Sequence, residues 1–177
     1  NILWQSGSIQ AIDKSRIVHW NEVNPLTKTG KLTVDAKIGA GDAPYKIINV
    51  QADGRLGADP GSHISFLPYV HNVDSFGYNT DAISPGIPYE TESWGWLLDD
   101  KYRGKVAVVN APTIGIFDMA LAAQSLGLMS FKDIGSMTRD EIDQLFAILE
   151  RKKQRGHFSG FWNSVPESVA FMKSGRV

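Results

Sequence analysis

The sequence predicts an α/β fold, and three segments carry that prediction. Lys105–Val109 reads KVAVV, an almost unbroken β-branched run that is typical of a strand buried on both faces. Apolar residues at helical spacing follow it in Ile116–Leu126 and again in Thr138–Arg155. Strands that alternate with helices in this way favour a sheet with some parallel pairing.

The first third of the chain is rich in turn signals, so its elements are predicted to be short. Between the turns, Lys31–Val34 and Tyr45–Val50 have the composition of strands. The pattern becomes more regular from Ile64 onward, where Ile64–Tyr69 and Asp74–Asn79 are also predicted as strands. Helices are expected only after these segments.

Two helices are predicted on either side of the Lys105–Val109 strand. Ser93–Asp100 is short, and Ser93 is its expected N-cap. Ile116–Leu126 is longer and ends at Gly127, because glycine readily adopts the left-handed conformation that terminates helices.

Two further helices carry capping-box sequences. Thr138 and Glu141 open the helix Thr138–Arg155, which has the strongest amphipathic pattern of the chain. Ser164 and Glu167 have the same spacing and predict a final helix near the end of the sequence.

The composition excludes some classes of functional site and argues against some classes of partner. The chain has 177 residues, a formal net charge of −1 and no cysteine, which excludes disulfides, thiolate zinc sites and cysteine nucleophiles. The basic residues of 151–155 complement a helix dipole, so we expect no nucleic-acid partner. No apolar run approaches the roughly 20 residues of a membrane helix, so we expect no membrane insertion.

Sequence signals for catalysis are missing. The chain has no G-x-S-x-G elbow, no H-E-x-x-H helix and no phosphate-binding P-loop. His71 and Asp74 could share a site, but two ligands do not make a metal site. We therefore expect no catalytic residue, no metal and no cofactor, and a protein that is not an enzyme.

The loop Asn110–Thr113 is the strongest candidate for a binding segment. It joins the Lys105–Val109 strand to the next helix, and the carboxyl ends of strands are where open α/β sheets bind ligands. Asn110 or Thr113 is expected to cap the helix, with Pro112 in its first turn. Capping alone is the competing explanation for these polar residues.

Four segments, in order, resemble one family. Residues 8–20 read SIQAIDKSRIVHW, 59–83 read DPGSHISFLPYVHNVDSFGYNTDAI, 93–109 read SWGWLLDDKYRGKVAVV and 161–177 read FWNSVPESVAFMKSGRV. These segments resemble bacterial extracellular solute-binding proteins of the spermidine/putrescine type. The resemblance spans nearly the whole chain and is weakest at residues 21–58.

The resemblance implies the periplasmic-binding-protein type II architecture, in which two α/β lobes enclose a cleft. Residues 1–76 would form part of lobe one and a crossing segment, and residues 77–177 would form most of lobe two. The chain is then expected to be an internal fragment whose residues 1–70 rest on further structure.

The resemblance also implies a function. Such proteins capture a small polar organic solute between their lobes and deliver it to the membrane permease of an ABC importer, without chemistry. The expected location is periplasmic, or extracellular and membrane-tethered, with a signal peptide in the precursor. The alternative is a ligand-sensing effector domain of a transcription regulator, which can share this fold.

Four site residues follow from the resemblance. Tyr69 matches a tyrosine that lines the cleft of polyamine binders, and His71 stands where these proteins often have tryptophan. Asn163 and Ser164 match an Asn-Ser pair that faces the cleft at a helix start.

The family's two acidic ligands are replaced in this chain. Polyamine binders carry them in the loop where this sequence has Pro112 and Gly115, so we expect weak polyamine binding unless another acid, such as Asp74, takes their role. Helix starts near Thr113 and Ser164 would then present hydrogen-bond donors that suit an anionic group.

Overall fold

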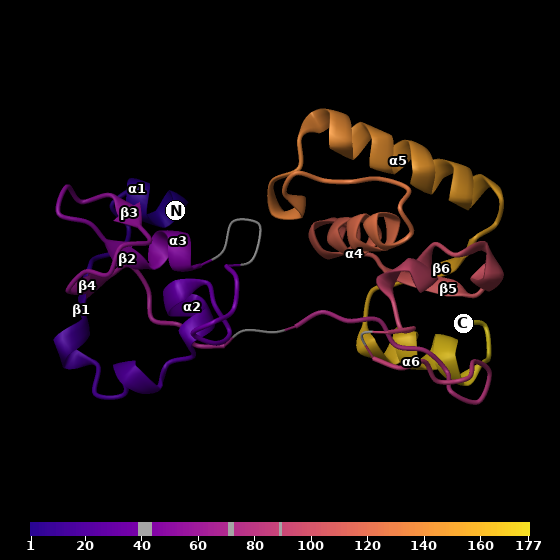
Figure 1. Ribbon diagram of the computed structural model, residues 1–177, viewed down its shortest axis with the longest axis horizontal. Helices are drawn as coiled ribbons and strands as arrows, with labels where there is room; N and C mark the ends of the chain where they lie inside the picture. The colour runs from indigo at the N-terminus through magenta and orange to yellow at the C-terminus, as the bar shows by residue number, and fades with distance from the viewer. Residues whose placement is uncertain (39–43, 71–72, 89) are drawn as a thin grey trace. The chain divides into compact units, whose positions relative to one another are not determined.

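The computed structural model describes residues 1–38, 44–70, 73–88 and 90–177. It shows a mixed α/β protein with a small antiparallel sheet and a parallel strand pair. The chain divides into two compact units, Asn1–Val73 and Asp74–Val177, which we call unit 1 and unit 2 (Figure 1). Their assignment to two lobes stays a prediction.

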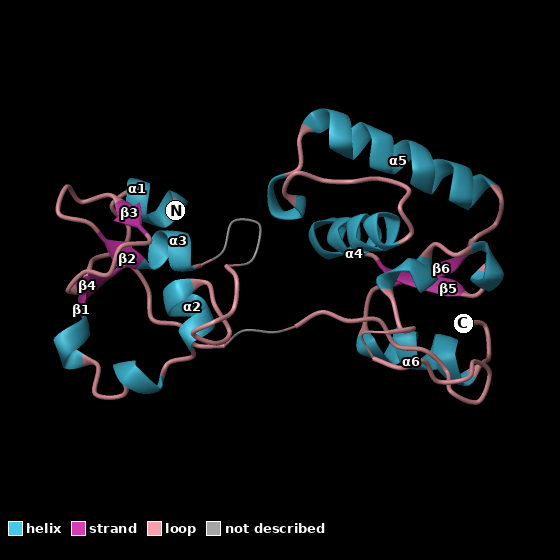
Figure 2. Cartoon of the chain, in the orientation of Figure 1, coloured by secondary structure: helices cyan, strands magenta, loops and turns pink. Residues whose placement is uncertain are grey.

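Unit 1 is built from very short elements (Figure 2). Its helices are α1 (Ile2–Gln5), α2 (Pro25–Thr29) and α3 (Tyr45–Ile48), with 3-10 turns η1 (Lys14–Arg16) and η2 (Trp20–Glu22). Its strands are β1 (Ile12–Asp13), β2 (Asn49–Val50), β3 (Leu56–Gly57) and β4 (His63–Ile64). They pair antiparallel in the order β1-β4-β2-β3.

The core of unit 1 is small. Ile48 and Ile64 are its only large side chains that are fully buried among the residues described. Ser65 Oγ donates to Ile47 O at 2.7 Å, and Trp4 Nε1 donates to Gly54 O at 3.0 Å. Unit 1 therefore closes a sheet of its own around few apolar side chains, and its dependence on further structure stays a prediction.

The strand predictions in unit 1 are largely wrong. Lys31–Val34 forms bends and turns, and Val34 is 88% exposed. Tyr45–Val50 begins as helix α3 and is a strand only in its last two residues. The strand predicted from Ile64 ends at Ile64 itself. β-branched composition reflects packing on a sheet face, and each of the two later runs buries only two adjacent residues, Ile48 and Asn49 in one and Ile64 and Ser65 in the other, so neither run buries a continuous face.

Unit 2 holds the longer elements. Its strands β5 (Val106–Val109) and β6 (Phe158–Trp162) pair parallel. Its helices are α4 (Pro112–Ser125), α5 (Arg139–Gln154) and α6 (Val165–Lys173), with 3-10 helices η3 (Trp94–Leu97), η4 (Asp100–Tyr102) and η5 (Ile134–Ser136). Helices α4 and α5 lie on one side of the strand pair and α6 on the other (Figure 1).

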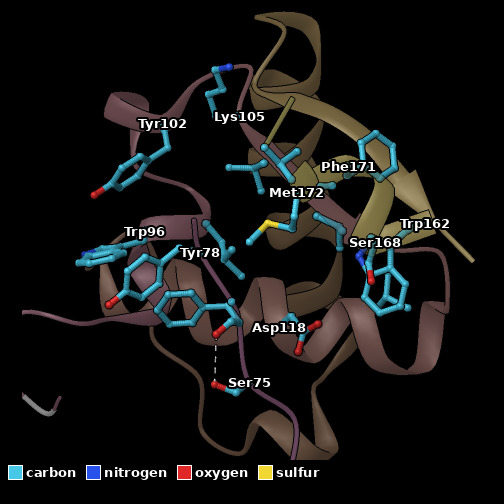
Figure 3. Close-up of a pocket in the computed structure, with 18 of the residues that line it drawn as sticks. Ser75, Tyr78, Trp96, Tyr102, Lys105, Asp118, Trp162, Ser168, Phe171 and Met172 are labelled. Atoms are coloured by element: carbon cyan, nitrogen blue, oxygen red, sulfur yellow. Dashed lines mark hydrogen bonds between the residues drawn. The ribbon is translucent and has the colours of Figure 1, made fainter. Parts of the chain in front are cut away.

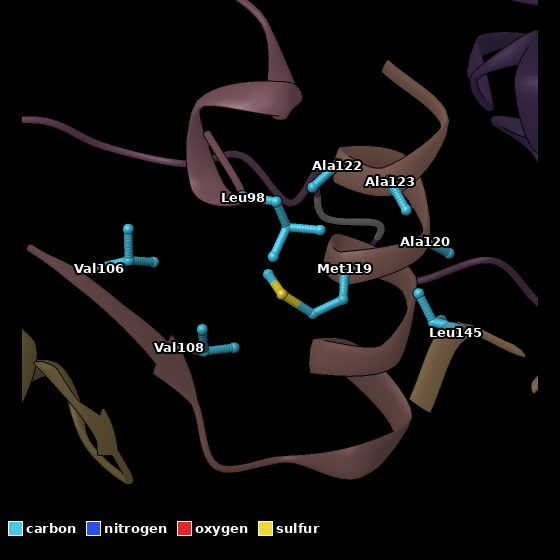
Figure 4. Packing of buried hydrophobic residues seen from close by; sticks show 8 residues of the cluster. All are labelled: Leu98, Val106, Val108, Met119, Ala120, Ala122, Ala123 and Leu145. Carbon is cyan, nitrogen blue, oxygen red and sulfur yellow. The ribbon is translucent and has the colours of Figure 1, made fainter. Parts of the chain in front are cut away.

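The core of unit 2 lies between β5 and helices α4 and α5 (Figure 4). Val106 and Val108 point from the strand toward Met119, and Leu145 of α5 is fully buried. Ala120, Ala122 and Ala123 are fully buried, and their small side chains let α4 pack closely against its neighbours. The alternation of buried and half-buried residues along β5 leaves one face of the strand for the core and the other for α6.

The helices of unit 2 largely follow the sequence prediction. Thr138 Oγ1 accepts from Glu141 N, and a Glu141 carboxylate oxygen accepts from Thr138 N at 2.7 Å, which confirms this capping box. The segment expected as a helix at Ser93–Asp100 is instead the 3-10 helix η3, capped by Ser93 as expected. Asp74–Asn79, predicted as a strand, has no regular structure.

Candidate functional site

The carboxyl ends of β5 and β6 meet at a pair of asparagines. Asn110 follows β5 and donates from its backbone N to Trp162 O at 2.8 Å. Its side chain Nδ2 donates to Asn163 Oδ1, also at 2.8 Å. The side chains that follow the two parallel strands are therefore joined, as expected where strands end at one edge of a sheet. We call Asn110, Thr113, Asn163 and Ser164 the strand-end site.

The start of α4 differs from the prediction. Ala111 is the N-cap and makes no side-chain bond, so neither Asn110 nor Thr113 caps this helix. Pro112 holds the first helical position, as predicted. Thr113 lies exposed in the first turn, which contains no acidic residue. The helix start therefore keeps its positive dipole end without a carboxylate of its own.

The start of α6 is closed by a carboxylate. Ser164 is the N-cap, and its Oγ accepts from Glu167 N at 3.4 Å. Glu167 Oε2 accepts from Asn163 N at 2.5 Å and from Asn163 Nδ2 at 3.3 Å, so the second capping box is not reciprocal. Glu167 thus occupies both Asn163 donors, and its negative charge disfavours a second anion at the start of α6, whereas the anion-binding wall itself stays a prediction.

Three further site residues were predicted from the sequence, namely Tyr69, His71 and Asp74. Tyr69 belongs to unit 1 and is 97% exposed. His71 lies outside the described residues. Asp74 belongs to unit 2, where its charge acts on Asp118 of α4. Among the predicted site residues, the structure shows a direct side-chain bond between Asn110 and Asn163.

A cavity of about 280 Å³ lies in unit 2 along β5 (Figure 3). Its walls come from residues 75–78, from η3, from all four residues of β5 and from α6. The aromatic side chains among its lining residues include Phe76, Tyr78, Trp94, Trp96, Tyr102 and Trp162. We call it the aromatic cavity.

Ring packing explains why residues 75–78 do not form the predicted strand. The ring centroids of Phe76 and Trp94 are 5.6 Å apart, and those of Tyr78 and Trp96 are 5.1 Å apart. The Tyr78 hydroxyl also donates to the Glu92 carboxylate, and this bond raises the pKa of Tyr78. These contacts hold the segment against η3, and edge-to-face geometry of this kind adds to the energy of apolar burial.

Asp118 brings a carboxylate to the aromatic cavity. Burial raises the pKa of Asp118, and the charge of Asp74 raises that pKa further. No described residue forms a hydrogen bond or an ion pair with Asp118. Lys105 lines the cavity on the opposite side from Asp118 (Figure 3) and donates from Nζ to Gly175 O at 2.8 Å.

Sequence reasoning missed both the aromatic cavity and Asp118. One signal was present, because Asp118 is the only charged residue in the otherwise apolar and small-residue stretch Pro112–Ser125. A second was the density of aromatic residues between Phe76 and Tyr102. Neither signal predicts a cavity from the sequence alone, because the fold of the chain decides whether Asp118 and the aromatic residues lie together.

The described residues contain no group of three or more histidine, aspartate or glutamate side chains that could hold a metal ion. Across the same residues, no helix combines the length and the apolar character needed to cross a membrane. Comparison with family models, with curated proteins and with solved structures finds no match to this chain. The function proposed for this chain therefore depends on the site geometry and on the sequence motifs.

Proposed function

We propose that this chain is the solute-binding component of an ABC importer and that the strand-end site contacts a small polar organic solute. The observation that carries the proposal is the bond from Asn110 Nδ2 to Asn163 Oδ1 at the ends of two parallel strands. Ligands of open α/β folds bind at this edge of the sheet. The four sequence motifs resembling extracellular solute-binding proteins support the same function.

The chemistry of the strand-end site suits recognition rather than catalysis. Asn110 and Asn163 are exposed, and each primary amide offers both donors and an acceptor. The Asn110–Asn163 bond fixes the orientation of both side-chain amides. It leaves the side-chain oxygen Oδ1 of Asn110 as an acceptor for a solute. Thr113 adds a hydroxyl in the first turn of α4. Polar groups held in place by the scaffold are what specificity for a small solute requires.

The proposal includes the periplasmic-binding-protein type II architecture, a periplasmic or membrane-tethered location and delivery to a permease. The second candidate is the effector-sensing domain of a transcription regulator, which the same strand-end geometry supports. Cell fractionation of the natural protein separates the two, because an importer component lies outside the cytoplasmic membrane and a regulator lies inside.

Calorimetry on the full 177-residue chain tests the binding function. Glycine, succinate, glucose and putrescine serve as probes of the zwitterionic, anionic, neutral and polycationic classes. We expect saturable binding of at least one probe, weakened about tenfold or more by Asn110→Ala and by Asn163→Ala. Asn21→Ala in unit 1 is the matched control, since Asn21 is exposed and remote in sequence from the strand ends.

Two results would overturn the proposal. One is the absence of saturable binding for all four probes. The other is binding that neither Asn110→Ala nor Asn163→Ala changes, which would place the solute elsewhere on the chain.

A further inference from the structure

Asp118 is a charged group without a visible structural role. It is half-buried on α4, among apolar and small residues, and no described residue pairs with its carboxylate. Taking a carboxylate out of water is unfavourable unless a donor or a cation compensates for the lost hydration. The nearby charge of Asp74 adds repulsion. A bound cation would relieve both costs, because it attracts each carboxylate.

The rest of the aromatic cavity is suited to an apolar body. Tyr78 and Trp96 line one wall, and Val109 of β5 and Met172 of α6 line others. Aromatic faces attract cations through their quadrupole, and aliphatic side chains exclude water from an apolar ligand. A volume of about 280 Å³ is close to the lower end of the range of small-molecule pockets.

Lys105 limits the charge that the cavity accepts. It lies on the opposite side of the cavity from Asp118 (Figure 3), and Gly175 O holds its ammonium group. A ligand with a second positive charge would bring that charge toward Lys105. Like charges repel, so the cavity favours one cationic end over two.

We propose that the aromatic cavity binds a small organic monocation, with the cationic group at Asp118 and an apolar or aromatic body along β5. This site shares no residue with the strand-end site and does not depend on the proposed import function. It also discriminates against linear diamines, whose far ammonium group would approach Lys105.

Calorimetry on the full chain at neutral pH tests the proposal with three probes. Phenethylammonium carries one charge and an aromatic body, phenethyl alcohol is its neutral counterpart, and hexamethylenediammonium carries two charges. We expect saturable binding of phenethylammonium, about tenfold or more tighter than that of the other two.

Variants locate the charge that is responsible. Asp118→Asn keeps the shape of the side chain and should weaken phenethylammonium binding about tenfold while leaving phenethyl alcohol unchanged. Asp143→Asn removes a carboxylate charge from the exposed face of α5 instead. It should change neither the affinity for phenethylammonium nor that for phenethyl alcohol. Chemical-shift changes of the Trp96 and Trp162 indole N–H groups should report the bound ligand, since both side chains line the cavity.

Three outcomes would overturn the proposal. They are equal affinity for phenethylammonium and phenethyl alcohol, unchanged binding in Asp118→Asn, and tightest binding of hexamethylenediammonium. Asn110→Ala should leave phenethylammonium binding intact, so failure at the strand-end site and failure at the aromatic cavity are separately visible.

Discussion

His157 Nε2 bonds to the carbonyl oxygen of Leu97 at 2.9 Å and thereby joins the residue before β6 to η3. His157 is fully buried, and its other ring nitrogen, Nδ1, has no hydrogen-bond partner among the residues described. Because a carbonyl only accepts, Nε2 carries a proton, and burial disfavours the charged form of the ring by lowering its pKa. The bond anchors the helix that presents Trp94 and Trp96 to the aromatic cavity.

This arrangement predicts that unit 2 loses stability in mild acid. Burial lowers the pKa of His157, and Lys152 lowers it further, against the opposing effects of the Leu97 carbonyl, Asp100 and Asp99. Between this lowered pKa and the ordinary value of about 6.5, the unfolded chain binds more protons than the folded chain. The free energy of unfolding should therefore fall as the pH drops below about 6.5 and be constant, for this group, above it.

Urea unfolding followed by the amide signals of Val106–Val109 would measure this dependence. His157→Gln keeps a donor for Leu97 but does not titrate, so the difference between the two proteins isolates the histidine. A difference that stays constant from mildly acidic to neutral pH would contradict the assignment.

The core of unit 2 predicts a large contrast between neighbouring residues of α5. Leu145 is fully buried, whereas Phe146 is 48% exposed. Leu145→Ala should lower the free energy of unfolding by about 2–5 kcal/mol, because it leaves a cavity against α4. Phe146→Ala is the matched control and should lower the free energy of unfolding clearly less than Leu145→Ala does. Equal losses in urea unfolding would mean that α5 does not pack as described.

Sequence predictions succeeded where the signal is local. The capping residue Thr138 and its partner Glu141 lie three positions apart, so their bond depends on one turn of helix alone. Strand β5 was likewise recognisable, because Val106–Val109 is apolar on both faces.

Predictions failed where the outcome depends on distant partners. Strand β6 (Phe158–Trp162) contains Gly160 in a mixed stretch, and only pairing with β5 makes it a strand. The aromatic residues near Phe76 alternate as in a strand, but their rings pack on η3 instead. The link between Asn110 and Asn163 spans 53 positions of sequence and could be expected only at the level of two loops at one sheet edge.

A further prediction concerns the glycine in β6. A Cβ atom at Gly160 would lie 2.7 Å from the Phe171 ring of α6, closer than side chains approach each other. Gly160→Ala should therefore push α6 outward and destabilise unit 2 by about 1–3 kcal/mol. Gly77→Ala is the control, because a Cβ atom there meets nothing within 4 Å. Urea unfolding of both variants checks this, and a neutral Gly160→Ala would show that α6 is free to move away.

The unpaired carboxylate of Asp118 predicts an opposite pH dependence from that of His157. Burial, and then Asp74, raise the pKa of Asp118 above its ordinary value of 3.8, so the folded chain binds more protons than the unfolded chain just above that pH. Asp118 therefore costs no stability below pH 3.8 and costs progressively more as the pH rises to the raised pKa, above which the cost is constant.

Asp118→Asn should remove this cost and stabilise unit 2 at neutral pH, by about 0.5 kcal/mol, the scale of changes at partly exposed positions. Asp143→Asn should not stabilise the unit, because Asp143 lies exposed on α5, 3.7 Å from Arg139. Urea unfolding at neutral pH measures the stability of each protein, and its repetition with phenethylammonium measures how much the ligand stabilises each. The ligand should stabilise the natural chain more than Asp118→Asn, since its cationic group needs the carboxylate. Equal stabilisation of the two proteins would show that the carboxylate costs stability without contributing to binding.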